Sequence, residues 1–216
     1  MPESSWFTEK DLQRIEAAVK ASEKGTSGEI VPVFVEQAGE YPEAAPRSAF
    51  MGMCLALAGF LLWDLLIPSW NVESPLLITL ILLSGALLLW TVSRFTPAWR
   101  RWMIGKEALS QQALAKSDQW FLREEVFKTR HRTGIMIFVA KFEHQVIVKA
   151  DKGISKLVEQ DEWEHIVKDL VGAIRSKSYT DGIVKAINDC STLLQQKGIE
   201  ALPDDTDELS NSLRME

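Results

Sequence analysis

The sequence predicts an α/β domain that is interrupted by a hairpin of two membrane-spanning helices. Residues 48–67 and 75–93 are apolar, with Asp64 as their single charge, and each is long enough to cross a bilayer, which takes roughly 20 residues. Short runs rich in Val, Ile and Phe, typical of strands, lie on both sides of this pair, next to amphipathic helical segments. Because neither flank has enough sheet to bury its apolar faces alone, we expect both flanks to form one soluble domain.

The two apolar segments lack the polar stripe that a helix on a soluble core usually carries, although buried helices of such a core are the alternative interpretation. Tryptophans near the segment ends suit the headgroup zone of a membrane: Trp63, Trp70 and Trp90. Small residues at helical spacing would let the second helix approach the first closely: Gly52, Ala56 and Gly59. We therefore predict a transmembrane hairpin that packs through this small-residue face.

Basic residues are distributed unevenly around the hairpin. The connecting segment 68–74 has no Lys or Arg, whereas the outer flanks carry Arg47, Arg94, Arg100, Arg101 and Lys106. By the positive-inside rule, this asymmetry predicts two spans with both termini in the cytoplasm. The run 94–103 (RFTPAWRRWM) alternates basic and aromatic residues, which suits anionic lipid headgroups. The lipid bilayer is accordingly an expected partner.

Composition argues against several other classes of protein. The net charge of −6 is unlike that of a nucleic-acid-binding protein, which needs a concentrated basic face. The first 46 residues lack the basic start, short apolar run and small-residue cleavage site of a secretory signal, so we expect the hairpin to be part of the protein. Cys54 lies inside the first span and Cys190 in a soluble helix, so the two cysteines are not expected to pair.

The soluble segments follow the order helix, strand, hairpin, helix, strand, strand, helix, helix. Thr8 suits the N-cap of the first helix, and Asp161 with Glu164 resembles a capping box on a later one. Pro32, which lacks an N–H donor, predicts an edge position or an irregularity in the first strand. The expected strands cover residues 30–35, 135–139 and 146–148, and the later helices cover residues 105–130, 161–176 and 180–197. We divide the chain into residues 1–46, the hairpin region 47–95, residues 96–200 and an acidic disordered tail, 201–216.

Two stretches carry a recognisable pattern: residues 8–36 (TEKDLQRIEAAVKASEKGTSGEIVPVFVE) and residues 132–154 (RTGIMIFVAKFEHQVIVKADKGI), followed by the helix pair up to Gly198. They resemble the TPM domain family, in which a helix and an (S/T)-G-E-I-V-V strand precede a crossover helix, a G-I-L-I-F-V strand and a D-x-G-I turn. The resemblance implies a small mixed β-sheet flanked by helices. With the inserted hairpin, it also implies a bacterial member anchored in the inner, cytoplasmic membrane.

For some members, the resemblance implies acid phosphatase activity or divalent-metal binding, and for others a role in assembling or maintaining membrane complexes. Many members carry Asp-Asn-Gly before the central strand, where this chain has Arg132, Thr133 and Gly134, so an acid that could ligate metal is missing there. The candidate catalytic residues are Asp151 and Glu143, with Arg132 as the cation, and the candidate ligands for Ca²⁺ or Mg²⁺ are Asp151, Glu143 and Glu29. The alternative for Asp151 is a tight turn closed by Gly153.

We favour a non-enzymatic, membrane-anchored interaction or assembly module. Its expected partners are the bilayer and another membrane protein, with a homo-oligomer as a further possibility. The alternative is a divalent-metal-dependent phosphatase, a phosphomonoester hydrolase tethered by the hairpin. At least three carboxylates converging on one site would favour the enzyme, whereas the three histidines, His131, His144 and His165, show no zinc-type spacing.

Overall fold

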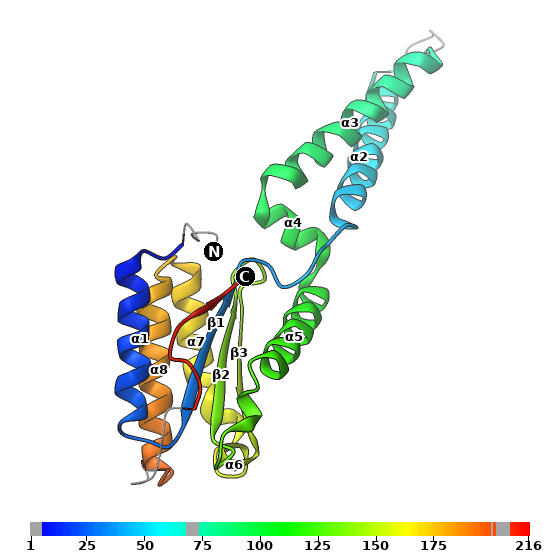
Figure 1. Ribbon diagram of the computed structural model, residues 1–216. Helices are drawn as coiled ribbons and strands as arrows, with labels where there is room; N and C mark the ends of the chain where they lie inside the picture. The colour runs from blue at the N-terminus through cyan, green and yellow to red at the C-terminus, as the bar shows by residue number, and fades with distance from the viewer. Residues whose placement is uncertain (1–5, 68–73, 200, 202–207) are drawn as a thin grey trace. The chain divides into compact units, whose positions relative to one another are not determined.

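The computed structural model describes residues 6–67, 74–199, 201 and 208–216. The chain divides into two compact units, of which the first is Met1–Ala38 with Ser110–Glu216 and the second is Gly39–Leu109. The first unit is an α/β domain and the second contains two long apolar helices (Figure 1). The predicted fold class, an α/β domain with a pair of apolar helices between its first and second strands, is confirmed.

The α/β unit is built on a four-stranded sheet in the order β3-β2-β1-β4. Its strands are β1 (Glu29–Val35), β2 (Gly134–Ala140), β3 (Gln145–Ala150) and β4 (Arg214–Met215). β1 pairs in parallel with β2 and with β4, whereas β2 and β3 form an antiparallel hairpin. The sheet is therefore mixed, as expected, and its two central strands come from opposite sides of the apolar helices.

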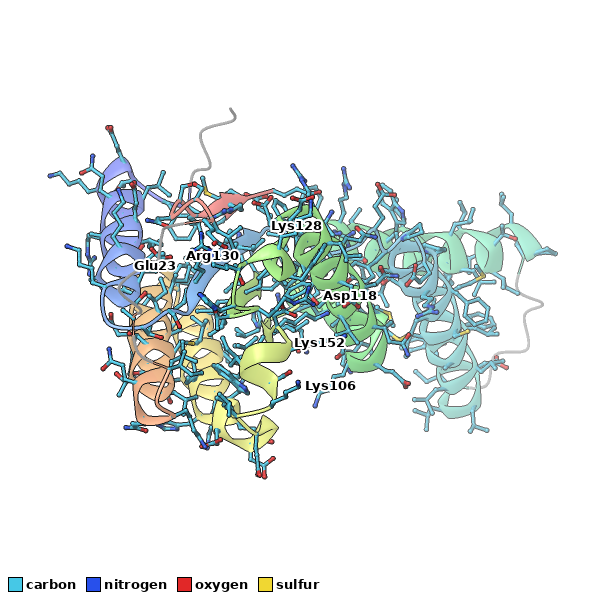
Figure 2. The ribbon with its side chains drawn as sticks, turned by 60° about the horizontal axis from the view of Figure 1, so that its bottom comes forward. Glu23, Lys106, Asp118, Lys128, Arg130 and Lys152 are labelled. Carbon is cyan, nitrogen blue, oxygen red and sulfur yellow. The ribbon has the colours of Figure 1, made fainter. Side chains whose placement is uncertain are left out.

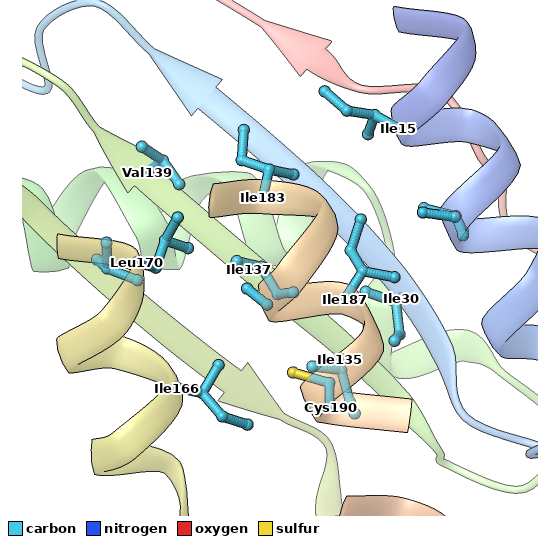
Figure 3. Packing of buried hydrophobic residues seen from close by; sticks show 14 of the residues in the cluster. Ile15, Ile30, Ile135, Ile137, Val139, Ile166, Leu170, Ile183, Ile187 and Cys190 are labelled. Atoms are coloured by element: carbon cyan, nitrogen blue, oxygen red, sulfur yellow. The ribbon is translucent and has the colours of Figure 1, made fainter. Parts of the chain in front are cut away.

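Helices cover both faces of this sheet (Figure 1). α1 (Glu9–Glu23), α7 (Gln160–Arg175) and α8 (Tyr179–Gln196) pack on the face that receives Ile135, Ile137 and Val139 of β2. Figure 3 shows this core from close by, with the isoleucines of α8 lying over those of the sheet. The even-numbered side chains of β2 pack on the other face with residues of α5 (Lys106–Arg123) and of the 3₁₀ turn Val126–Lys128. β1 and β2 are buried along their whole length, as strands between two layers should be.

Pro32 lies in a central strand, β1. Among the described residues, this part of β1 pairs with β2 but not with β4. β4 pairs with Val33 and Phe34, and Glu216 bonds with Phe34 O at 3.1 Å and with Glu36 N at 2.9 Å. The even-numbered residues of β1 thus direct their backbone groups toward β4. Pro32 lies before β4 begins, so its missing N–H leaves no gap in the ladder and the edge-like character predicted for it is confirmed locally.

The helices begin at local capping signals, one of which was predicted at the wrong residues. Thr8 caps α1 in a capping box with Asp11, as the sequence predicts for Thr8. The capping box of α7 is formed by Glu159 and Glu162, so the pairing of Asp161 with Glu164 is wrong by two residues. The physical reason is the hydrophobic staple: Val158 and Trp163 are both buried on either side of the Glu159 cap, which fixes where the helix can begin. α5 ends at Arg123, earlier than expected, because Glu125 adopts a left-handed φ of 53°.

The prediction of a disordered tail at 201–216 is wrong for residues 208–216, while residues 202–207 lie outside the described residues. β4 extends the sheet, and Leu213 is 8% exposed in the main core. Arg214 Nε lies 2.8 Å from a carboxylate oxygen of Glu124, and Lys116 Nζ lies 2.6 Å from one of Glu216. A short strand that pairs through its backbone with an open strand edge and buries one leucine does not need a long apolar run. The acidic composition of this segment therefore wrongly predicted disorder.

The second unit contains α2 (Ala44–Leu66), α3 (Pro75–Phe95) and the short α4 (Pro97–Ile104). α2 and α3 are long and apolar enough to span a membrane, with only 6% of the most apolar stretch of each buried. A Cβ added at Gly85 would lie 2.5 Å from Gly52 O and 2.7 Å from Ala56 Cβ, so the two helices cross with backbone against backbone. The predicted small-residue face is confirmed at Gly52 and Ala56. A Cβ at Gly59 would meet nothing within 4 Å, and Trp70 lies outside the described residues.

Candidate functional site

Asp151 follows β3 and is the N-cap of α6 (Lys152–Ser155). Its Oδ1 accepts a hydrogen bond from Lys152 N at 2.7 Å, and its Oδ2 lies 2.7 Å from Nε of Arg132. Nη2 of Arg132 also donates to Oδ1 at 3.2 Å. The side chain of Asp151 is 5% exposed and that of Arg132 is 46% exposed. Asp151 is therefore a buried carboxylate that is already paired with a guanidinium and with a helix N-terminus.

Two turns hold this ion pair in place. Gly153 N donates to Arg132 O at 3.0 Å, and Asp151 N donates to Gly134 O at 2.9 Å. A Cβ added at Gly153 would lie 2.5 Å from Arg132 O, so the close approach of the two turns requires glycine. Arg132 has a left-handed φ of 58°, a conformation that costs a non-glycine residue roughly 1 kcal/mol or more. The Asp-x-Gly turn thus fixes the backbone that precedes β2.

Glu29 lies at the same end of the sheet, where β1 begins. Glu29 pairs with Gly134 across β1 and β2, and Gly134 O accepts a hydrogen bond from Asp151 N on the other side of β2. The backbones of Glu29 and Asp151 are therefore about two strand spacings, roughly 10 Å, apart. Glu29 Oε1 accepts a hydrogen bond from Glu208 N at 3.0 Å. The Glu208 carboxylate in turn accepts from Arg130 N at 2.7 Å; Figure 2 labels Arg130 near this end. Glu29 therefore helps to fix the C-terminal segment on the sheet.

Glu143 lies at the opposite end of the sheet, in the turn between β2 and β3. It is 4% exposed, and its Oε1 accepts a hydrogen bond from Ala38 N at 2.9 Å. β2 runs from Gly134 to Ala140, a length of roughly 20 Å at about 3.3 Å for each step. Glu143 is therefore too far from Asp151 to ligate the same ion.

The structure brings three of the four candidate residues, Arg132, Asp151 and Glu29, to one end of the sheet and separates Glu143 from them. Within the part of the chain that the structure describes, no three acidic, His or Cys side chains surround a common metal position. Thr133, beside the position of the missing acid, donates its hydroxyl to a backbone carbonyl, Ser27 O, at 2.7 Å. The contacts of these side chains hold turns together, and a cation could reach Asp151 only after the guanidinium had moved away.

Sequence reasoning missed a second polar cluster, at the carboxyl ends of β1 and β2. Lys141 Nζ lies over the ring of Trp6, whose indole N–H donates to the carboxylate of Glu36. Burial lowers the pKa of Lys141 and the charge of Lys177 lowers it further, although Glu36 opposes this shift. Burial also raises the pKa of Tyr179, which meets Trp6 edge-on with ring centroids 6.3 Å apart. These residues are far apart in the sequence: the parallel pairing of β1 with β2 brings Glu36 close to Lys141, whereas Trp6 precedes α1 and Tyr179 begins α8.

The chain is similar to known proteins in sequence and in fold. A model of the TPM domain matches residues 100–193, a stretch that includes the Arg132–Asp151 pair. Among curated proteins, none matches the sequence. The NMR structure of the BA42 protein from the psychrophilic bacterium Bizionia argentinensis shares the fold with a TM-score of 0.59 and 16% sequence identity, covering 99% of this chain and 98% of that one. The resemblance to the TPM domain family is therefore confirmed for residues 100–193, the stretch that matches the TPM domain model.

Proposed function

We propose that this chain is a membrane-anchored interaction module and not an enzyme. The observation that supports this most directly is the state of Asp151, whose carboxylate lies 2.7 Å from the Arg132 guanidinium. A metal-dependent phosphatase would need Asp151 as a ligand, yet Oδ2 of Asp151 is already paired with the Arg132 guanidinium. Glu143, the other candidate ligand, lies at the other end of the sheet. A metal ion could bind Asp151 only by displacing the guanidinium that already neutralises this buried carboxylate.

The anchor in this proposal is the pair of helices α2 and α3. Both leave most of their apolar surface open, with Leu65 75% exposed and Leu88 63% exposed. A contiguous apolar surface of this extent needs an apolar environment, which a bilayer supplies. We propose that the two helices span a bacterial inner membrane and that the basic residues flanking them keep both termini in the cytoplasm.

The surface proposed for a protein partner is the outer edge of the sheet. β3 is an outermost strand, and a groove of about 650 Å³ lies between it and α7. Val146 and Val148 of β3 line this groove together with Asp161 and Lys168 of α7. Addition of an extended segment to a sheet edge is a common mode of protein recognition. The proposed occupant is an extended cytoplasmic segment of another membrane protein, and the competing outcome is a second copy of this chain.

An activity assay separates the module from the enzyme. The purified full chain should hydrolyse p-nitrophenyl phosphate no faster than its Asp151→Asn, Glu143→Gln double variant, and millimolar calcium or magnesium should leave its melting temperature nearly unchanged. The matched control is Lys156→Gln, an exposed change on the same unit. Activity that requires metal, survives repurification and disappears only in the double variant would overturn the module in favour of the tethered phosphatase.

Membrane anchoring and topology are tested separately from activity. The full chain should stay with membranes after carbonate extraction, and a chain whose residues 44–95 are replaced by a flexible linker should be released. In a background without Cys54 and Cys190, a cysteine at Asn71, outside the described residues, should react with an impermeant maleimide in intact cells. A cysteine at Glu9 should not react. The reverse labelling pattern would place the α/β unit on the far side of the membrane.

A further inference from the structure

α4 is fixed across the base of the apolar hairpin. It begins at Pro97, directly after α3 ends at Phe95. The indole N–H of Trp99 donates to Ser48 Oγ of α2 at 3.1 Å, and Nη1 of Arg47 donates to Met103 O at 3.3 Å. α4 is therefore joined by the chain to the end of α3 and by hydrogen bonds to the start of α2.

The two helix ends that α4 joins lie at nearly the same level. Gly52 of α2 crosses Gly85 of α3 with backbone against backbone. From this crossing, α2 extends back to Ala44 and α3 extends on to Phe95, distances of about 12 Å and 15 Å at about 1.5 Å for each residue. When α2 and α3 span a bilayer, α4 consequently lies at the depth of the lipid headgroups on one side.

The charges of this unit are concentrated at the same end. The sequence has no Lys or Arg between Arg47 and Arg94, and the remaining basic residues of the unit, Arg100, Arg101 and Lys106, follow in or next to α4. Figure 2 labels Lys106. Three acidic residues, Glu40, Glu43 and Glu107, also lie near this end, where five basic residues are found. The opposite end of α2 carries Asp64 and no basic residue.

Exposed aromatic rings accompany these basic residues. Phe95 is 82% exposed and Trp102 is 64% exposed, whereas Trp99 is partly buried against α2. The rings of Trp99 and Trp102 lie 5.1 Å apart between centroids. Aromatic side chains of this kind favour the boundary between headgroups and acyl chains, where one part of the ring is apolar and another is wet. Rings and guanidinium groups thus offer two different contacts to one lipid molecule.

We propose that α4 and its flanking basic residues form a binding surface for anionic phospholipid headgroups, in which Arg94, Arg100 and Arg101 contact the lipid phosphate and Trp102 lies beside the acyl chains. This inference rests on the proposed membrane anchoring and adds lipid selectivity to it. Arg is suited to this task because its planar guanidinium donates two parallel hydrogen bonds to phosphate oxygens. Near an anionic surface, each basic residue favours binding by about fivefold, which corresponds to about 1 kcal/mol.

The test measures lipid selectivity around the full chain. The chain is reconstituted into vesicles of phosphatidylcholine with phosphatidylglycerol, and electron paramagnetic resonance records the immobilised fraction of a spin-labelled lipid of each class. The Arg94→Gln, Arg100→Gln, Arg101→Gln triple variant removes charge at the surface. The matched control removes the same charge from exposed positions of the α/β unit: Lys10→Gln, Lys156→Gln and Arg175→Gln. A second variant replaces the three arginines of the surface by lysine, which keeps their charge.

The wild type should immobilise phosphatidylglycerol several-fold more than phosphatidylcholine at low salt, and the control and lysine variants should retain most of this preference. The glutamine variant, or half-molar salt, should reduce the ratio toward one. Equal immobilisation of both lipids by the wild type would overturn the lipid surface while leaving the anchor intact. Loss of the preference in millimolar inorganic phosphate, but not in chloride of equal ionic strength, would show a free-phosphate site and also overturn it. A chain that fails to float with the vesicles would instead refute the anchoring.

Discussion

Removing the charge of Arg132 should destabilise the α/β unit more than removing the charge of Asp151. Arg132→Gln leaves a carboxylate that is 5% exposed without its countercharge, whereas Asp151→Asn leaves a guanidinium that is 46% exposed and can be hydrated. Asn also retains the ability to cap α6. Hydrogen bonds to charged groups contribute roughly 1.5–3 kcal/mol, so we expect losses of about 2–3 kcal/mol for Arg132→Gln and about 1–2 kcal/mol for Asp151→Asn.

The two losses should not add in the double variant. Once Asp151 is neutral, removing Arg132 no longer leaves a buried charge, so the coupling energy between the two changes should be about 1–2 kcal/mol. The free energy of unfolding would be measured by urea denaturation of the full chain in detergent, followed by near-ultraviolet circular dichroism. Arg130→Gln is the control: its guanidinium is 54% exposed and lies 3.9 Å from Glu208, so its loss should stay below about 1 kcal/mol. A coupling energy below about 0.3 kcal/mol would refute the ion pair as described.

Three further variants test other parts of the fold. Gly85→Leu should lower the melting temperature of the hairpin in detergent, followed by far-ultraviolet circular dichroism, because its side chain would meet the α2 backbone; Gly59→Leu should be tolerated, since nothing lies near it, and equal effects would refute the crossing. Leu213→Ala should lower the free energy of unfolding by about 2–3 kcal/mol and speed proteolysis of the C-terminal segment, whereas a silent variant would mean that β4 is not docked. Glu162→Gln should lower the melting temperature at pH 7, because hydrogen bonds from Lys197 and from the Glu159 backbone lower the pKa of Glu162 below 4.5. A lowered folded-state pKa gives stability that is present above 4.5 and lost as pH falls through the folded value, so a difference that persists well below that range would contradict the assignment.

The sequence was informative wherever a local pattern determines structure. The apolar runs predicted β2 and β3, and Thr8 predicted the start of α1, because strand formation and capping depend on neighbouring residues. β4 was missed because its two residues are polar and are stabilised by contacts with distant parts of the chain, such as Arg214 with Glu124.

In the candidate site, too, local patterns were predictable and contacts between distant parts of the chain were not. The turn role of Asp151 follows from the local Asp-x-Gly pattern, and the structure has it. The placement of Glu143 at the far end of the sheet depends on how β2 and β3 run, and residue identity alone does not carry that information. The interaction of Lys141 with Glu36 likewise depends on the pairing of β1 with β2, which are separated by nearly half of the chain.

The insertion of α2 and α3 between two neighbouring strands imposes an order on biosynthesis. Glu29 and Gly134 are register partners, so about 100 residues are made between them, which takes roughly 5–20 s at typical rates of synthesis. During this interval β1, apolar on both faces, has no strand to pair with, and β4 arrives only with the last residues of the chain. Pairing α2 with α3 about halves the free loop, yet this saves only about 0.6 kcal/mol of closure entropy. The apolar segment of β1 is therefore without its partner strand for seconds, and α2 and α3 are synthesised before the α/β unit can be completed.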